Sequence, residues 1–389
     1  MAQTNPGGIQ RVGVVGGGQL AWMMGFAAKS LGIELVVQTP KETDPAVGVA
    51  QAVVLADVAD VAGTQALANQ CDVVTFENEF IDGAGLQALA DGGVIFRPGL
   101  GVLTLVLDKL HQRQFFDRIG LPNPHYVDLE SEDNDATLTA QASTIGFPLV
   151  MKTRRLGYDG YGTFVVKDQA QLQAAWAKTN RAPILLEEFV PFKQELAIMV
   201  ARSAQGEIAV YPTVETQQVA QICRRVLAPA RVSAEVARTM EQFAHTLVEQ
   251  LVLVGIIGIE AFLTQDDQIL INEIAPRTHN SGHYTLEACQ TSQFEQQLRA
   301  VSDRPLGPTD LICLQAVMIN LLGLDVSEAE HHRRLAILNQ QPQAQVYWYG
   351  KAPRPGRKLG HITRCLGPTD DPAVLAHALE SIWYSPSSP

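Results

Sequence analysis

The stretch that decides the fold is "GIIGIEAFLTQDDQILINEIA", residues 255–275, in which two apolar runs flank a short polar segment. Runs of Ile, Leu and Phe separated by polar turn residues are typical of a β-hairpin. If the turn is centred on Asp266 and Asp267, Glu260 lies directly opposite Glu273. The pattern therefore predicts two carboxylates held side by side on adjacent strands.

On this register the two acids share one face of the hairpin with Gly258 and Ile271. The other face is apolar and carries Ile257, Ile259, Ala261 and Leu263. Like charges directly opposed across a strand pair are destabilising, so the acids need a partner. A hard divalent cation such as Mg²⁺, which takes one or two carboxylates plus substrate phosphates, fits that need. The alternative is a pair of side chains that splay apart at a wet edge of the sheet.

A second informative stretch is "MKTRRLGYDGYGTFVV", residues 151–166. Lys152 ends an apolar strand, where a buried ammonium is costly unless an anion meets it. Gly157, Gly160 and Gly162 allow the following loop to fold its N–H groups around phosphate oxygens and to close as a lid. The alternative is an ordinary long hairpin loop. Together with the facing acids, the loop and lysine predict an Mg·ATP site, although the chain has no Walker motif.

The first hundred residues alternate strand-like and helix-like segments, beginning with "RVGVVGG" and "QLAWMMGFAAKSLG". Further strands are expected at "IELVVQT", "QAVVLA", "DVVTFE" and "GVIFRP". This order predicts an open, mostly parallel sheet with helices on both faces.

The glycines of "GVVGGGQLAW" fit the G-x-G-x-x-A form of a dinucleotide-binding turn at Gly16, Gly18 and Ala21. Gln38 and Thr39 stand where that turn requires an acid for the ribose, which disfavours a dehydrogenase. Two readings remain: an anion bound at the helix N-terminus, or a tight strand-to-helix turn.

Downstream, the pattern predicts one helix over 104–119 and another over 233–253. It also predicts strands at 147–153, 163–167, 184–189, 195–202 and 207–211. The last eighty or so residues carry a few short strands, the basic segment "RPGRKLGHIT" and a terminal helix.

Composition narrows the class of partner. The chain has 389 residues, 46% of them apolar, and a formal net charge of −12, so its surface as a whole repels nucleic acid and anionic membranes. We expect no membrane span and no secretory signal, because no apolar run is long enough and no basic-then-apolar start is present. Five scattered cysteines without a C-x-x-C pair favour reduced thiols in the cytoplasm.

Several stretches resemble one family over essentially the whole chain. They are "GGGQL" (16–20), "TFENEF" (75–80), "DKLHQRQFFDRIGLPNP" (108–124), "GYDGYG" (157–162), "INEIAPRTHNSGHYT" (271–285) and "RPGRKLGH" (354–361). The chain is similar to the 5-(carboxyamino)imidazole ribonucleotide synthases of the ATP-grasp superfamily. The glycine loop indicates only the superfamily, whereas the "HNSGH" and "RPGRKLGH" segments are specific to this family.

The resemblance implies an α/β chain with α+β elements and an ATP-grasp fold. A Rossmann-like domain over 1–108 would precede an ATP-grasp domain over 109–308, with its lid at 154–162, and a small C-terminal domain over 309–389. The implied reaction is ATP- and bicarbonate-dependent carboxylation of aminoimidazole ribonucleotide (AIR) through carboxyphosphate, giving ADP and phosphate, in purine biosynthesis. The implied assembly is a homodimer. Alternatives are another ATP-grasp ligase, such as formate-dependent phosphoribosylglycinamide formyltransferase or a biotin carboxylase subunit, or a nonenzymatic nucleotide sensor.

The resemblance also implies roles for individual residues. The expected ATP contacts are Lys109, Lys152, Gly157, Tyr158, Asp159, Gly160, Tyr161, Gly162, Thr163, Glu187, Glu188, Phe189, Val190, Glu195, Gln218, Asn272 and Glu273, with Mg²⁺ on Glu260 and Glu273. Among them, residues 187–190 are expected along the adenine and Glu195 at the ribose hydroxyls. The expected AIR contacts are Tyr158, Asp159, Arg277, His279, Asn280, Lys351, Arg354, Arg357 and Lys358, of which Arg354, Arg357 and Lys358 are expected near its phosphate. Lys152, Asp159 and Arg277 are the expected catalytic residues.

Four features of the sequence bear on individual contacts among these expected site residues. The family often has a basic residue at Tyr161, glycine at Leu156 and asparagine at Thr216. The i, i+4 spacing of His279 and His283 suits zinc on a helix, but "APRT" and "NSG" around them favour a loop in which His279 contacts substrate.

Overall fold

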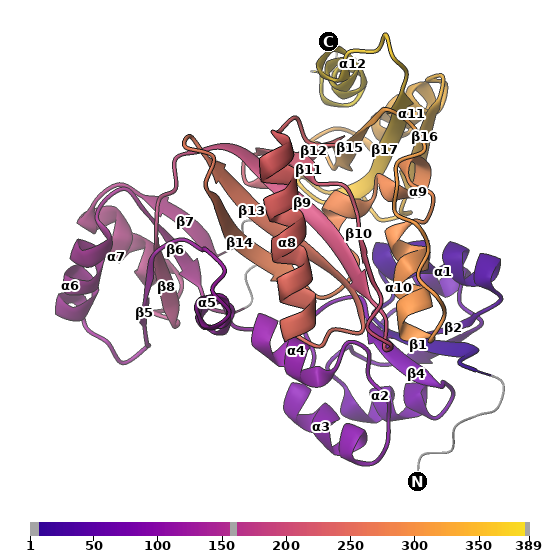
Figure 1. Ribbon diagram of the computed structural model, residues 1–389, viewed down its shortest axis with the longest axis horizontal. Coiled ribbons are helices and arrows are strands. Elements are labelled where there is room, and N and C mark those ends of the chain that lie inside the picture. The colour runs from indigo at the N-terminus through magenta and orange to yellow at the C-terminus, as the bar shows by residue number, and fades with distance from the viewer. Residues whose placement is uncertain (1–7, 156–161, 386–389) are drawn as a thin grey trace.

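The N-terminal part of the chain forms a four-stranded parallel sheet in the order β3-β2-β1-β4 (Figure 1). The structure, a computed structural model, describes residues 8–155 and 162–385. The elements of this part are β1 (Arg11–Val15), α1 (Gln19–Leu31), β2 (Glu34–Thr39), η1 (Pro45–Gly48), β3 (Ala52–Leu55), α2 (Val61–Ala68), β4 (Val73–Phe76) and α3 (Gly83–Asp91). The predicted parallel sheet is confirmed, but "GVIFRP" contributes only an isolated bridge between Val74 and Phe96 rather than a full strand.

Two short helices, α4 (Leu100–Val106) and α5 (Lys109–Arg118), replace the single helix predicted over 104–119. Asp108 causes the break. Its carboxylate caps α5 by accepting from the N–H of Leu110 at 3.0 Å, and it pairs with the guanidinium of Arg154 at 2.7 Å. An Asp N-cap favours the start of a new helix, so Lys109 is placed on its first turn.

A small antiparallel sheet follows, in the order β5-β8-β6-β7, with α6 and α7 on one side (Figure 1). Its elements are β5 (Tyr126–Leu129), α6 (Asp135–Ile145), β6 (Leu149–Thr153), β7 (Thr163–Val166), α7 (Gln169–Lys178) and β8 (Ile184–Glu188). Trp176 of α7 and Leu138 of α6 are buried against Leu149 and Leu186 of the sheet. Strands β6, β7 and β8 were predicted from their apolar runs, whereas β5, α6 and α7 were not.

A nine-stranded sheet forms the centre, with the path β14-β13-β9-β11-β12-β15-β17-β16, and β10 pairs with β9. Its strands are β9 (Phe192–Arg202), β10 (Ile208–Val210), β11 (Val214–Val219), β12 (Ile222–Ala228), β13 (Gly255–Thr264), β14 (Ile269–Ala275), β15 (Gln315–Leu322), β16 (Ala344–Trp348) and β17 (Lys358–Leu366). Because β15 pairs with β12, the C-terminal strands extend the central sheet. The domain boundaries expected after residues 108 and 308 remain predictions.

The remaining helices lie against this sheet or beside its C-terminal strands β15, β16 and β17 (Figure 1). They are α8 (Ala234–Gln250), η2 (Asn280–Gly282), α9 (Thr285–Ala288), α10 (Gln293–Val301), α11 (Glu328–Leu338) and α12 (Pro372–Tyr384). Among the described residues, no helix combines the length and the apolar character needed to cross a bilayer.

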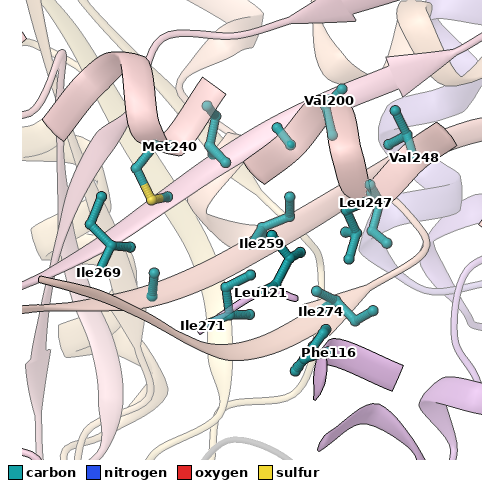
Figure 2. Packing of buried hydrophobic residues seen from close by; sticks show 14 of the residues in the cluster. Phe116, Leu121, Val200, Met240, Leu247, Val248, Ile259, Ile269, Ile271 and Ile274 are labelled. Carbon is teal, nitrogen blue, oxygen red and sulfur yellow. The ribbon is translucent and has the colours of Figure 1, made fainter. Parts of the chain in front are cut away.

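The apolar face of the β13–β14 hairpin packs on α8 and forms one hydrophobic core (Figure 2). Met240 and Leu247 of α8 point toward Ile259 and Ile274 of the hairpin, and all four are buried. Burying a large aliphatic side chain stabilises a fold by roughly 1.5–3 kcal/mol. The apolar face of the hairpin is therefore anchored on α8, and its opposite face is left for polar side chains.

Candidate active site

Glu260 of β13 and Glu273 of β14 are directly paired in the hairpin, as the sequence predicted. The register then shifts, because a β-bulge follows Glu260 and Ala261 pairs with Ile271 instead of Asn272. The expectation that Ile271 shares the face of the acids is therefore wrong: Ile271 lies in the apolar core (Figure 2). The extra residue in the bulge is Asn272, and a bulge changes the direction of a side chain. The side chain of Asn272 therefore lies on the same side of the sheet as Glu273, where it accepts a hydrogen bond from Lys152.

The two facing acids differ strongly in their charge environment. The ammonium of Lys109 lies 2.6 Å from Glu273. Burial raises the pKa of Glu273, but the charge and hydrogen bond of Lys109 outweigh it and lower that pKa to about 2. Burial, followed by repulsion from Glu273 and Glu195, raises the pKa of Glu260 to about 7. One carboxylate is thus neutralised by a lysine and the other is not.

Lys152 lies on β6 and is buried, as its position at the end of an apolar strand predicted. Its ammonium is 2.6 Å from Glu187 and donates to the amide oxygen of Asn272 at 3.0 Å. Burial lowers the pKa of Lys152, and the charge of Glu187 opposes that shift. The anion that meets this buried lysine within the protein is therefore Glu187.

Glu187 is the centre of a buried ion triad. Arg113 of α5 lies 2.7 Å from one carboxylate oxygen of Glu187, and Lys152 lies 2.6 Å from the other. Burial raises the pKa of Glu187, but the two cations more than compensate and lower it. Arg113 also donates to the carbonyl of Ile271 at 3.1 Å, so it connects the small sheet to the bulged strand. The sequence reasoning did not identify Arg113.

The segment expected along the adenine, residues 187–190, comprises the end of β8 and the two residues after it. The backbone N–H of His125 donates to the carboxylate of Glu188 at 2.9 Å. Phe189 is exposed and Val190 is buried. The side chain of Glu187 points inward and forms the ion triad. In this segment only the residues after Glu187 can therefore contact a nucleotide.

Glu195 of β9 lies beside the facing acids. It pairs with Phe262 on β13, which places it on the same face as Glu260 and one step further along the sheet. Burial raises the pKa of Glu195 to about 7, and a hydrogen bond from Gln218 of β11 opposes that shift. The structure therefore brings together the expected ribose and metal residues.

The glycine-rich loop is described only at its edges. Thr163 pairs with Lys152, and the carbonyl of Gly162 accepts from the N–H of Thr153 at 2.8 Å. Gly162 has φ +80°, and a Cβ there would lie 2.3 Å from the hydroxyl of Thr153, so glycine is required. Gly157, Tyr158, Asp159, Gly160 and Tyr161 lie outside the described residues.

The segment after β14, residues 277–283, faces the acids. Nε2 of His279 lies 3.5 Å from Glu260, and Arg277 donates to the carboxylate of Glu79 at 3.0 Å. A Cβ at Gly258 would approach Cβ of His279 to 2.7 Å, so glycine on the acid face makes room for this histidine. Asn280 forms a pair of hydrogen bonds with Asn320.

The sequence left zinc on His279 and His283 as an alternative and favoured a loop in which His279 contacts substrate. The structure places His279 at the start of the short η2 turn rather than on an α-helix. His283 is fully buried, and its Nδ1 faces the amide of Gln293 at 3.1 Å. The described residues contain no group of three or more His, Cys, Asp or Glu side chains arranged to hold a metal. Glu260 and Glu273 form a carboxylate pair of the kind that Mg²⁺ takes alongside substrate phosphates.

The N-terminal glycine turn binds a carboxylate that belongs to the chain itself. Glu77, the residue directly after β4, accepts from the N–H of Gly18 at 2.5 Å and of Leu20 at 3.1 Å. A Cβ at Gly18 would lie 2.3 Å from Glu77, which explains the glycine. Burial raises the pKa of Glu77, whereas hydrogen bonds from the helix N–H groups and the charge of Lys351 oppose that shift. The sequence left open an anion at this helix N-terminus or a tight strand-to-helix turn, and the structure places the carboxylate of Glu77 at the helix N-terminus.

The basic segment expected near the AIR phosphate lies beside this turn. Lys351 hydrogen-bonds the side chain of Gln19, and burial lowers its pKa while Glu77 opposes that shift. Arg354 is exposed, and burial together with the charge of Arg354 lowers the pKa of Arg357. Lys358 acts electrostatically on Glu260. These four cations connect the N-terminal helix with the acid face.

The arrangement can bind a polyanion next to a cation-binding pair of acids. Lys109 and Lys152 approach from the small-sheet side, whereas the basic segment approaches from the C-terminal strands. Such convergence of positive charge suits a nucleotide polyphosphate on one side and a second phosphorylated ligand on the other. Sequence signals for the missed residues existed: "TFENEF" contains Glu77 and Glu79, and "LQAVMINLL" contains Asn320 as a polar residue in an apolar strand.

Three protein families match consecutive parts of the chain. The Ribonucleotide synthetase preATP-grasp domain matches residues 9–105, and the ATP-grasp domain matches residues 114–294. The Phosphoribosylaminoimidazole carboxylase C-terminal domain matches residues 316–372.

Relatives and solved structures match the chain over nearly its full length. The chain is 50% identical over 392 aligned residues to an N5-carboxyaminoimidazole ribonucleotide synthase of Synechococcus elongatus, covering 98% of this chain and 97% of the relative. A crystal structure of the synthase of Aspergillus clavatus with ATP has a TM-score of 0.88, 33% identity and coverage of 96% of both chains. A structure from the same organism with ADP and 5-aminoimidazole ribonucleotide has a TM-score of 0.89, 32% identity and coverage of 96% of this chain and 98% of the other.

Proposed function

The chain belongs to the N5-carboxyaminoimidazole ribonucleotide synthases, and from that membership we propose how its own residues carry out the family's reaction. It is an ATP-grasp ligase of purine biosynthesis that carboxylates AIR with ATP and bicarbonate. The observation that carries the assignment of roles is the convergence of Lys109, Lys152 and the facing acids Glu260 and Glu273 on one face of the hairpin. ATP is the nucleotide substrate, because the relative of known structure binds it.

We place the nucleotide phosphates between Lys109, Lys152 and the glycine-rich loop. Bicarbonate attacks the γ-phosphorus of ATP, which gives carboxyphosphate and ADP, and the two ammonium groups stabilise the negative charge that spreads over the phosphoryl oxygens. Glu195 and Gln218 are placed to bind the ribose. When bound, Mg²⁺ on Glu260 and Glu273 supplies the positive charge that lets the phosphates approach the carboxylates.

The exocyclic amine of AIR then forms a C–N bond to the carboxyl carbon of carboxyphosphate, the bond from that carbon to the phosphate oxygen breaks, and inorganic phosphate leaves as the amine loses a proton. We place the phosphate of AIR on Arg354, Arg357, Lys358 and Lys351, and its ring near Arg277, His279 and Asn280. Asp159 and Tyr158, which lie outside the described residues, complete this set as expected contacts. A closed glycine-rich loop would keep water away from carboxyphosphate, because such acyl phosphates hydrolyse readily.

Formation of ADP by the purified protein tests the reaction. The full rate should require ATP, Mg²⁺, AIR and bicarbonate together, and omission of AIR or bicarbonate should reduce it sharply. Stimulation by formate and phosphoribosylglycinamide instead of AIR would show that the chain is a different ATP-grasp ligase. ATP binding without any phosphate release would indicate a nucleotide sensor.

Assembly and location are further proposals. We propose a homodimer by family resemblance, which light scattering after size-exclusion chromatography tests directly. We propose a cytoplasmic location, because all five cysteines are free thiols and a reducing compartment keeps them so. Fluorescence microscopy of the tagged chain in its host checks that location.

A further inference from the structure

Asn280 is held by a second asparagine from the C-terminal strands. Nδ2 of Asn280 donates to Oδ1 of Asn320 at 2.9 Å, and Nδ2 of Asn320 donates back to Oδ1 of Asn280 at 2.7 Å. Asn320 lies on β15 and is fully buried. Its Nδ2 also donates to the backbone carbonyl of Cys223 on β12 at 2.9 Å.

The Cys223 carbonyl determines the orientation of both amides. A carbonyl oxygen only accepts hydrogen bonds, so the NH₂ group of Asn320 must face β12. Its two hydrogens are then used on Cys223 and on Oδ1 of Asn280. The oxygen of Asn320 is left to accept from Asn280, and the amide of Asn280 cannot turn over without losing both bonds. A main-chain carbonyl thus sets the donor and acceptor sense of Asn280 through Asn320.

The backbone around Asn280 is fixed separately. The side-chain oxygen of Gln293 accepts from the N–H of His279 at 2.9 Å, and its nitrogen donates to the carbonyl of His279 at 2.8 Å. This two-bond clamp comes from α10 and does not involve Asn320. Loss of the Asn320 amide would therefore release the side chain of Asn280 while the clamp still holds the main chain.

We propose that Asn320 is a positioning residue for AIR. Asn280 donates one hydrogen bond to Asn320 and accepts one from it, so its amide keeps one N–H donor and one lone pair on its oxygen. Asn320 fixes where these lie, so Asn280 presents its remaining donor and acceptor to the substrate in one sense only. A freely turning amide would present an acceptor where a donor is needed half of the time, and an unpaired polar group weakens binding strongly. This inference rests on the proposed contact between Asn280 and AIR.

The substitution Asn320→Asp tests the proposal, because it keeps the shape but replaces the NH₂ group by oxygen. That oxygen would face the Cys223 carbonyl and Oδ1 of Asn280, both acceptors, so Asn280 is driven out of its orientation. We expect the KM for AIR to rise about tenfold or more, while the KM for ATP stays within about twofold of the wild type.

Gln296→Glu is the matched control. Gln296 is also fully buried and makes two bonds to the backbone of Gly307, donating at 2.7 Å and accepting at 2.8 Å. The same amide-to-carboxylate change there should leave the ratio of the two KM values unaltered. Asn320→Ser removes the amide without adding charge, and it should show the same KM split if Asn320→Asp does not fold.

Three outcomes overturn the role of Asn320. They are an unchanged KM for AIR in a folded variant, equal rises in both KM values, or an equal effect from Gln296→Glu. Wild-type activity separates this inference from the function it rests on. If wild-type protein forms no ADP in response to AIR, the proposed function fails; if it does and Asn320→Asp behaves like wild type, only the positioning role fails.

Discussion

Lys109 and Glu273 form an ion pair at 2.6 Å, on the same hairpin face where Glu260 directly opposes Glu273. The lysine compensates one acid of the pair and leaves the other to bear the repulsion. This explains why the pKa of Glu273 is lowered to about 2 and that of Glu260 is raised to about 7. The close approach of the two acids therefore costs stability in the ligand-free protein.

Glu260→Gln should stabilise the ligand-free protein at pH 8. The unfolded chain ionises this carboxyl near its usual value of 4.5, whereas the folded chain resists ionisation until about pH 7. The free energy of unfolding of the wild type therefore falls as the pH rises from about 4.5 to 7, and Gln removes that loss. We expect a gain of about 1–3 kcal/mol at pH 8 and little gain at pH 4.5. Urea unfolding at the two pH values measures it.

Glu132→Gln is the control for this change, because Glu132 is exposed. It should leave the free energy of unfolding unchanged at both pH values. A Glu260→Gln protein that is less stable than the wild type at pH 8 would contradict the electrostatic description of the facing acids.

Arg113→Met should destabilise the protein, because it leaves a buried carboxylate with only one of its two cations. Breaking one partner of a buried ion pair typically costs roughly 3–5 kcal/mol. The double variant with Glu187→Gln should be less destabilised than the sum of the two single changes, because the uncompensated charge is then absent. Urea unfolding of the three variants measures this coupling.

Arg118→Met on the same helix is the control, since Arg118 is exposed and stacks on Phe115 at 5.1 Å. Its cost should be well below that of Arg113→Met. Equal costs, or strict additivity of Arg113 and Glu187, would show that the triad is not a coupled unit.

Arg357→Ala should raise the KM for AIR far more than the KM for ATP. A hydrogen bond to a charged group contributes about 1.5–3 kcal/mol, which corresponds to roughly a tenfold to hundredfold change in affinity. Steady-state rates with each substrate varied separately measure the two constants. Lys178→Ala, on the exposed end of α7, should alter neither. Equal changes in both KM values would overturn the placement of Arg357 at the AIR phosphate.

The part of the site that the sequence predicted is the part governed by local geometry. The hairpin pattern correctly predicted that Glu260 faces Glu273, and an apolar strand that ends in lysine indicated that Lys152 needs an anion. Beside the turn the register is shifted by one residue from the symmetric prediction, with Leu263 opposite Ile269, and the bulge that carries Asn272, which was not predicted, returns the pairing to Glu260 opposite Glu273.

Contacts between residues far apart in the sequence could not be predicted from local sequence patterns. Glu77 fills the helix N-terminus 59 residues upstream, and Arg113 pairs with Glu187 across 74 residues. Neither spacing carries a periodic signal. The helix break at Asp108 was missed because its leucine-rich flank continues the helical pattern, while the cap that interrupts it is stabilised by Arg154 from another element.

Calorimetric titration of ADP with and without Mg²⁺ tests the central claim, that Glu260 and Glu273 together form the cation site beside the nucleotide. In wild-type protein Mg²⁺ should strengthen ADP binding by about tenfold or more. In the double variant Glu260→Gln/Glu273→Gln, ADP should bind with an affinity that does not respond to Mg²⁺. A double variant that keeps the wild-type response to Mg²⁺ would contradict the account.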